Sequence, residues 1–85
     1  MMYSVLWSQK AEDALAESWL DASNRNSISI ATAFIETALG QRPFRVGNPL
    51  GSSVNRHVVI PPLGIVFDII EDDKKVIVQS CWLAG

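Results

Sequence analysis

Residues 55–83, which read NRHVVIPPLGIVFDIIEDDKKVIVQSCWL, decide the fold of this chain. Three runs within them are rich in valine, isoleucine and aromatic residues, as β-strands are. The break at residues 61–64 contains two prolines, which lack the amide donor that a sheet interior needs, and the break at residues 71–74 is polar, as a hairpin tip is. Connections this short join antiparallel neighbours, so the stretch predicts a three-stranded antiparallel meander.

Upstream of the meander, the sequence predicts one further strand and a first helix. Residues 3–7 have the composition of a short strand, whose partner in the sheet the sequence leaves open. Ser8 then stands where the N-cap of a helix over residues 11–23 is expected, because its hydroxyl can accept a hydrogen bond from an amide of the first turn.

A second helix is predicted to follow, because apolar residues recur at helical spacing over residues 28–39. Asn26 or Ser27 is expected to cap its start, and Gly40 to end it in the left-handed conformation that glycine adopts readily. Two helices joined by so short a turn are expected to pack as an antiparallel hairpin.

The element order β-α-α-β-β-β indicates a single α+β domain over residues 1–85. We expect the helical hairpin to pack on one face of an antiparallel sheet. Trp19 and Phe34 are the large side chains expected to fill the interface between the helices and the sheet.

The strand expected over residues 65–70 has two apolar faces. Ile65, Phe67 and Ile69 form one of them, and the residues that alternate with them are too apolar to be fully exposed. This second face is expected either to meet a partner or to be covered by loops.

Composition and charge restrict the classes of function that this chain can have. A net charge of −2 and a pI near 5.1 argue against a general nucleic-acid binder, which needs a basic patch to contact phosphates. The single cysteine, Cys81, allows no internal disulfide and fits a reducing compartment. No apolar run approaches the roughly 20 residues that span a bilayer, so we expect a soluble, cytoplasmic protein with no membrane partner.

The motifs of the common catalytic and cofactor sites are missing. The one histidine, His57, has only Cys81 as a soft companion, and the glycines lack the strand-to-helix context of a phosphate-binding loop. We therefore expect no metal and no cofactor. Asp72 and Asp73 are interpreted as a solvated turn, and Cys81 as a small buried side chain without a paired base.

Arg56 and His57 are the remaining candidates for catalysis. On a strand, neighbouring residues point to opposite faces, so the two cannot act on one substrate atom unless a bulge intervenes. Arg56 is either a rim arginine paired with Asp68 or Glu71, or a contact to a functional partner. For His57, a surface or edge position is favoured over proton transfer.

Several stretches of the chain resemble the RelE/ParE superfamily of bacterial toxins. They are YSVLWSQKAEDALAESWLDAS (residues 3–23), PFRVG (residues 43–47), and Arg56 followed by PPLGIVFDIIEDDKKVIVQSCW (residues 61–82), which together span nearly the whole chain. The resemblance implies a toxin of the plasmid-stabilisation kind that an antitoxin wraps and neutralises. It also implies one of two targets: RelE-type members cut messenger RNA on the ribosome, and ParE-type members poison DNA gyrase.

The chain departs from the RelE-type pattern at the residues that would cut RNA. Serines and a valine at positions 52–54 stand where RelE-type toxins place lysines, and the chain ends without a histidine or tyrosine. The resemblance therefore implies a toxin that binds a protein target, or a catalytically degenerate member, and it favours the absence of enzymatic activity. The alternatives are a weak ribosome-dependent mRNA endoribonuclease that uses Arg56 and His57, and a non-toxic interaction domain.

The resemblance and the long loop over residues 41–54 suggest where partners bind. We take Arg42, Arg45, Arg56 and Trp82 as candidate contacts to a target or an antitoxin. A cognate antitoxin, DNA gyrase or the ribosome, and a second copy of the chain are the candidate partners. Parallel strands in the sheet would contradict the resemblance.

Overall fold

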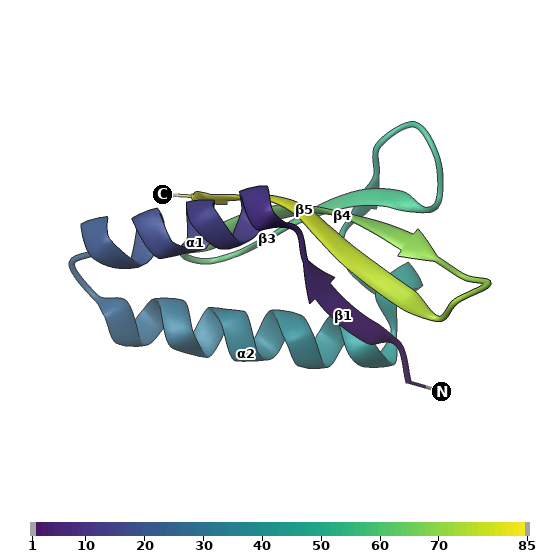
Figure 1. The fold of residues 1–85 in the computed structure, drawn as a ribbon, viewed down its shortest axis with the longest axis horizontal. Coiled ribbons are helices and arrows are strands. Elements are labelled where there is room, and N and C mark those ends of the chain that lie inside the picture. Colours follow the sequence, from purple (N-terminus) through teal and green to yellow (C-terminus); the bar gives the residue numbers. More distant parts are fainter. Residues whose placement is uncertain (1, 85) are drawn as a thin grey trace.

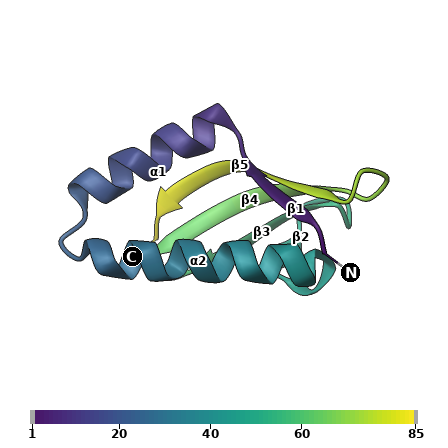
Figure 2. The same ribbon diagram turned by 60° about the horizontal axis from the view of Figure 1, so that its bottom comes forward.

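The computed structural model describes residues 2–84 as two layers, with two helices against one face of a five-stranded sheet (Figures 1 and 2). The predicted α+β architecture is confirmed. In chain order the elements are β1 (Ser4–Trp7), α1 (Gln9–Asp21), α2 (Arg25–Gln41), the 3-10 helix η1 (Pro43–Arg45), β2 (Asn48–Pro49), β3 (Asn55–Ile60), β4 (Leu63–Ile70) and β5 (Lys75–Leu83). No helix in the described part of the chain is long and apolar enough to cross a bilayer.

The antiparallel meander is confirmed as β3, β4 and β5, and the full strand order is β1-β5-β4-β3-β2. His57 pairs with Val66 across β3 and β4, and Val66 pairs in turn with Ser80 of β5. The next pair is Phe67 with Val78, so Gln79 is an extra residue on β5 and forms a bulge.

The expectation of a wholly antiparallel sheet is wrong at one edge. β1 runs parallel to β5, with Val5 beside Val76 and Trp7 beside Val78. Short connections fix the directions of β3, β4 and β5, but the two helices and the meander separate β1 from its partner, so no turn dictates its direction. This edge therefore contains the parallel strands that were expected to contradict the resemblance.

The helix caps agree with the sequence at α1 but not at α2. The Ser8 hydroxyl accepts from the Ala11 amide at 3.1 Å, as expected. For α2, the Asn24 side chain accepts from the Ser27 amide at 3.2 Å, so the prediction of Asn26 or Ser27 as the cap is wrong. Both candidates lie inside a helix that begins earlier than the apolar spacing indicated.

Gly40 does not end α2 in a left-handed conformation, as predicted, but lies buried inside the helix. A Cβ atom at this position would lie 3.4 Å from the Tyr3 carbonyl oxygen, and the Tyr3 amide donates to the Gly40 carbonyl at 2.7 Å. The glycine therefore lets the chain that enters β1 approach the end of α2 closely.

The core lies between the helices and the inner face of the sheet. Its buried apolar residues are Ala11, Ile28, Ala31, Ile35 and Leu39 from the helices and Leu63, Ile65, Phe67, Ile69, Val76, Val78 and Cys81 from the strands. The prediction that Trp19 and Phe34 fill this interface is wrong, because they are 38% and 58% exposed. Small and branched residues at helical spacing hold the helices close to the sheet, and the two aromatic residues fall beside that stripe.

Candidate interaction site on the outer face of the sheet

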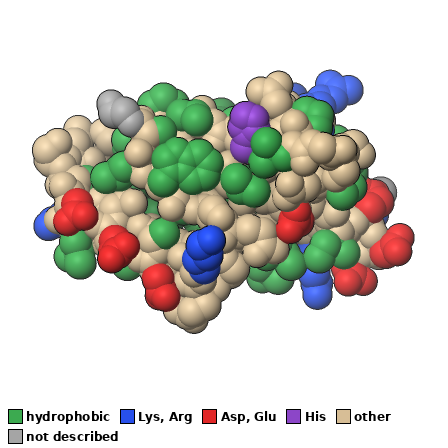
Figure 3. All heavy atoms as spheres, turned by 90° about the horizontal axis from the view of Figure 1, so that it is seen from above, with side chains coloured by type: hydrophobic (Ala, Val, Ile, Leu, Met, Phe, Trp, Pro, Cys, Tyr) green, Lys and Arg blue, Asp and Glu red, His purple; other side chains and the backbone are tan. Residues whose placement is uncertain are grey.

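The face of the sheet away from the helices carries apolar side chains from four strands. Strand alternation and register place on it Leu6 of β1, Val59 of β3, Val66 of β4, and Ile77 and Trp82 of β5; we call these five residues the outer-face patch. Figure 3 shows this face, where hydrophobic side chains lie next to the histidine. The expectation that the second face of β4 is too apolar to be simply wet therefore extends to the neighbouring strands.

Trp82 is held in place by its partner across the strands, Gly64. A Cβ atom on Gly64 would lie 2.3 Å from Cε2 of the indole, so the ring lies directly against the glycine backbone. The indole is nevertheless 40% exposed. A large aromatic surface fixed in this way is the kind of side chain that anchors protein–protein contacts.

A polar cluster of Asn55, Asp68 and Gln79 lies beside the patch, and its hydrogen bonds occupy the carboxylate of Asp68. Asp68 accepts from the Asn55 side chain at 2.5 Å and from the Gln79 side chain at 3.0 Å. Both carboxylate oxygens are occupied, and within residues 2–84 His57 has no side-chain hydrogen bond. The face therefore holds no base paired with the histidine.

Arg56 points away from this face and into the molecule, where it is only 8% exposed. Its guanidinium donates to the carbonyls of Val46 and Gly47, both at 3.0 Å, and of Ser53 at 3.2 Å. The interpretation of Arg56 as a rim arginine paired with Asp68 or Glu71 is therefore wrong. The arginine instead ties the two ends of the loop after η1 to β3, on the side opposite His57.

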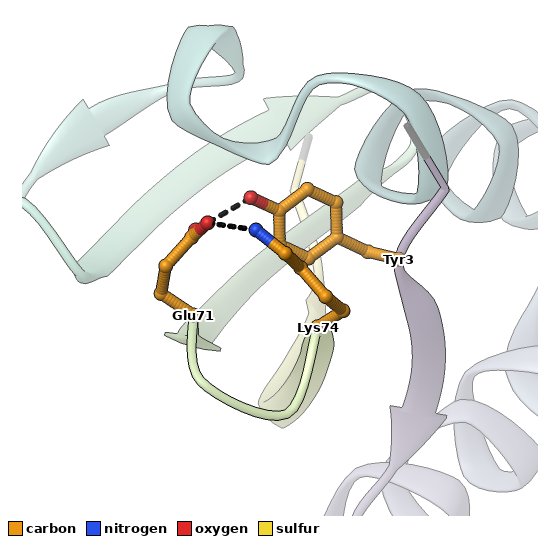
Figure 4. Close-up of polar contacts among 3 residues, drawn as sticks. All are labelled: Tyr3, Glu71 and Lys74. Atoms are coloured by element: carbon orange, nitrogen blue, oxygen red, sulfur yellow. Dashed lines mark hydrogen bonds and ion pairs between the residues drawn. The ribbon is translucent and has the colours of Figure 1, made fainter.

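Glu71, the other expected partner of Arg56, closes the hairpin between β4 and β5 (Figure 4). It forms an ion pair with Lys74 in the turn and accepts from the Tyr3 hydroxyl at 2.5 Å. The hydrogen bond from Lys74, and then the one from Tyr3, lower the pKa of Glu71 below its ordinary value. The hydrogen bond to Glu71 raises the pKa of Tyr3 in turn. These contacts fasten the start of β1 to the hairpin tip, where Asp72 and Asp73 are exposed.

Arg42 and Arg45 lie elsewhere, at the end of α2 and in η1. Both are exposed and line a pocket of about 450 Å³ on the helix side of the molecule, together with Phe34. The structure therefore does not bring the four expected contact residues together. Trp82 lies on the outer face, the two loop arginines lie at this pocket, and Arg56 lies inside.

The chemistry that the outer face can support is limited. Strand alternation gives the outward positions of β1, β3, β4 and β5 one cation, Lys75, at the far end of β5. Within residues 2–84 no three histidine, cysteine or acidic side chains are grouped as metal ligands. Cys81 is buried, and that burial raises the pKa of its thiol, which keeps it protonated and unreactive. What remains is an apolar surface suited to contact with another protein.

The sequence pointed to Trp82 but missed Leu6, Val59 and Ile77. Alternation along β5 carried the signal for Ile77. Leu6 joins it only because β1 pairs with β5, and that pairing has no signal in the sequence.

Comparison with known proteins bears on the fold. The sequence matches no family model and no curated protein. The structure is similar to a chain of the toxin–antitoxin complex RelBE2 from Mycobacterium tuberculosis, with a TM-score of 0.80 and 16% identity over 98% of this chain and 99% of that one. It is also similar to a chain of the chromosomal ParDE system of P. aeruginosa, with a TM-score of 0.69 and 16% identity over 99% and 98% of the two chains.

The same fold occurs within TrmO from P. aeruginosa, where the TM-score is 0.62 and the identity 23% over 99% of this chain but only 34% of that one. At these identities the likeness establishes the fold. The resemblance seen in the sequence is thus confirmed at the level of a RelE/ParE-like fold that covers the described chain. The expectation that parallel strands would contradict it is wrong, because the likeness holds for a chain in which β1 runs parallel to β5.

Proposed function

We propose that this protein is the toxin of a type II toxin–antitoxin module of the RelE/ParE superfamily, and that it acts by binding a protein target through the outer face of its sheet. The likeness in fold to chains of RelBE and ParDE structures, over 98% or more of this chain, carries the proposal. Because those structures are of toxin–antitoxin systems, a cognate antitoxin is the partner proposed here. The cytoplasm and a role in plasmid stabilisation belong to the same proposal.

The outer face supports binding over RNA cleavage. Cleavage through a 2′-hydroxyl needs proton transfer and stabilisation of the charge that develops on the phosphate. His57 is separated from Arg56 by the sheet, and Lys75 is the one outward cation of the four strands. Of the two target classes that the resemblance offers, DNA gyrase presents a protein surface and fits the outer-face patch better than ribosome-bound messenger RNA.

Controlled expression in bacteria tests the proposal. We expect growth arrest without increased messenger RNA cleavage, and relief of the arrest by Trp82→Ala. Phe44→Ala, which removes an aromatic side chain of similar exposure away from the outer face, is the matched control and should leave the arrest unchanged. Growth arrest with ribosome-dependent cleavage that His57→Ala abolishes would refute the binding mechanism, and normal growth on full expression would refute the toxin role.

A further inference from the structure

The pocket at the end of α2 combines an apolar floor with two exposed arginines. Phe34, Ala38 and Val46 supply apolar walls to its volume of about 450 Å³, which is in the range of ligand-binding pockets. Phe34 lies mostly in solvent, so an occupant would cover apolar surface that the fold leaves uncovered.

A short backbone turn holds the two arginines near each other in the chain. Arg42 is the N-cap of η1, and the Arg45 amide donates to the Arg42 carbonyl at 3.0 Å. Both arginines are among the residues that line the pocket. Pro43 between them is buried, which fastens the turn to the core.

The far wall of the pocket is also held in place. The Val46 carbonyl accepts from the buried guanidinium of Arg56, and the Val46 amide donates to the Pro43 carbonyl. The pocket is therefore formed by the fold and does not depend on an occupant to shape it.

The charge of the pocket is opposite to that of the chain as a whole. The chain carries a net charge of −2, yet no acidic residue lines this pocket, and neither arginine has an ion-pair partner within residues 2–84. Two like charges one turn apart repel each other, and an anion placed between them removes that repulsion. Guanidiniums bind carboxylates through paired hydrogen bonds, which makes arginine the residue suited to this anion.

We propose that this pocket binds an acidic segment of a partner protein, in which an apolar side chain covers Phe34 while neighbouring carboxylates bind Arg42 and Arg45. This inference does not rest on the proposed function. The outer-face patch lies on the face of the sheet away from the helices and has almost no positive charge, so the two surfaces suit partner segments of different chemistry.

Titration of the ¹⁵N-labelled protein with a matched pair of acetylated, amidated peptides tests the proposal. One peptide reads Glu-Glu-Phe-Asp-Glu-Leu, and its neutral counterpart reads Gln-Gln-Phe-Asn-Gln-Leu. We expect the acidic peptide to shift amide resonances of residues 34–46 and to bind at least tenfold more tightly than the neutral one. The double variant Arg42→Gln with Arg45→Gln should lose that difference.

The control removes two positive charges elsewhere, through Lys10→Gln with Lys75→Gln, and should keep at least half of the affinity. Both double variants change exposed side chains, and circular dichroism checks that each is folded. Equal binding of the two peptides, shifts centred on another surface, or no shift at millimolar peptide would overturn the proposal. The proposal would also be overturned if inorganic phosphate produced the same shifts and the acidic peptide failed to displace it, because the site would then bind free anions.

Discussion

Replacing Arg56 by alanine should destabilise the whole domain, not just one contact. The buried guanidinium donates to three carbonyl oxygens, and within residues 2–84 no carboxylate competes for it. Its removal leaves three carbonyls of the loop after η1 without their donor. The cavity also opens beside Phe67, the partner of Arg56 across β3 and β4.

The size of the effect follows from those three hydrogen bonds. A net contribution of about 1 kcal/mol for each bond, which is typical of neutral donors and below the range of charged ones because the loop can relax toward water, gives a loss of about 3 kcal/mol. Domains are stabilised by roughly 0.05–0.15 kcal/mol per residue, which corresponds to about 4–13 kcal/mol for this chain of 85 residues. Arg56→Ala should therefore remove a quarter or more of the stability and lower Tm by about 12–24 °C.

Urea unfolding followed by tryptophan fluorescence measures this loss. At an m-value of about 1–1.5 kcal/mol/M, the midpoint should fall by about 2–3 M. Arg56→Lys keeps the charge but cannot reach three acceptors with one ammonium, so it should recover less than half of the loss. Arg45→Ala, an exposed arginine of the same region, is the matched control and should change the stability by less than about 0.5 kcal/mol.

A loss below about 1 kcal/mol for Arg56→Ala, at an unchanged m-value, would refute this account of the arginine. The result also bears on function. If the variant is unfolded in cells, loss of toxicity in Arg56→Ala says nothing about catalysis. Trp82→Ala tests the target contact once circular dichroism shows that this variant is folded.

Three further predictions concern single contacts. Gly64→Ala should displace the Trp82 indole and shift its fluorescence to longer wavelength while the domain stays folded; an unchanged spectrum would contradict the close contact. The pKa of Glu71 is lowered in the folded protein, so its carboxylate stabilises the fold at pH values above its unfolded pKa, and this contribution is lost as the pH falls through the folded pKa. The wild-type protein should therefore lose stability relative to Glu71→Gln only in that acidic window. NMR titration should find the pKa of Glu71 below its ordinary value. Asn24→Ala should cost about 1 kcal/mol as a lost helix cap, whereas Asn26→Ala should cost less than half of that; the reverse order would restore the cap expected from the sequence.

The sequence by itself determined the elements whose partners are close along the chain. Short connections set the antiparallel directions of β3, β4 and β5, and alternation within β4 identified its buried face correctly. The cap at Ser8 was predictable for the same reason, because its acceptor and donor lie three residues apart. Of the four candidate contacts, Arg42, Arg45 and Trp82 are exposed, whereas Arg56 is buried.

The tertiary structure decided every feature that depends on contacts between distant segments. It placed β1 parallel to β5, which completed the outer-face patch, and it aimed Arg56 at backbone carbonyls and away from a carboxylate. Gly40 does not end α2; its missing side chain lets the chain that enters β1 pack closely against the helix. Every residue carries a carbonyl acceptor, so the sequence does not show which carbonyls a buried arginine will bind. The sheet edge at which an isolated strand pairs depends on the assembled core, so it leaves no pattern in the sequence either.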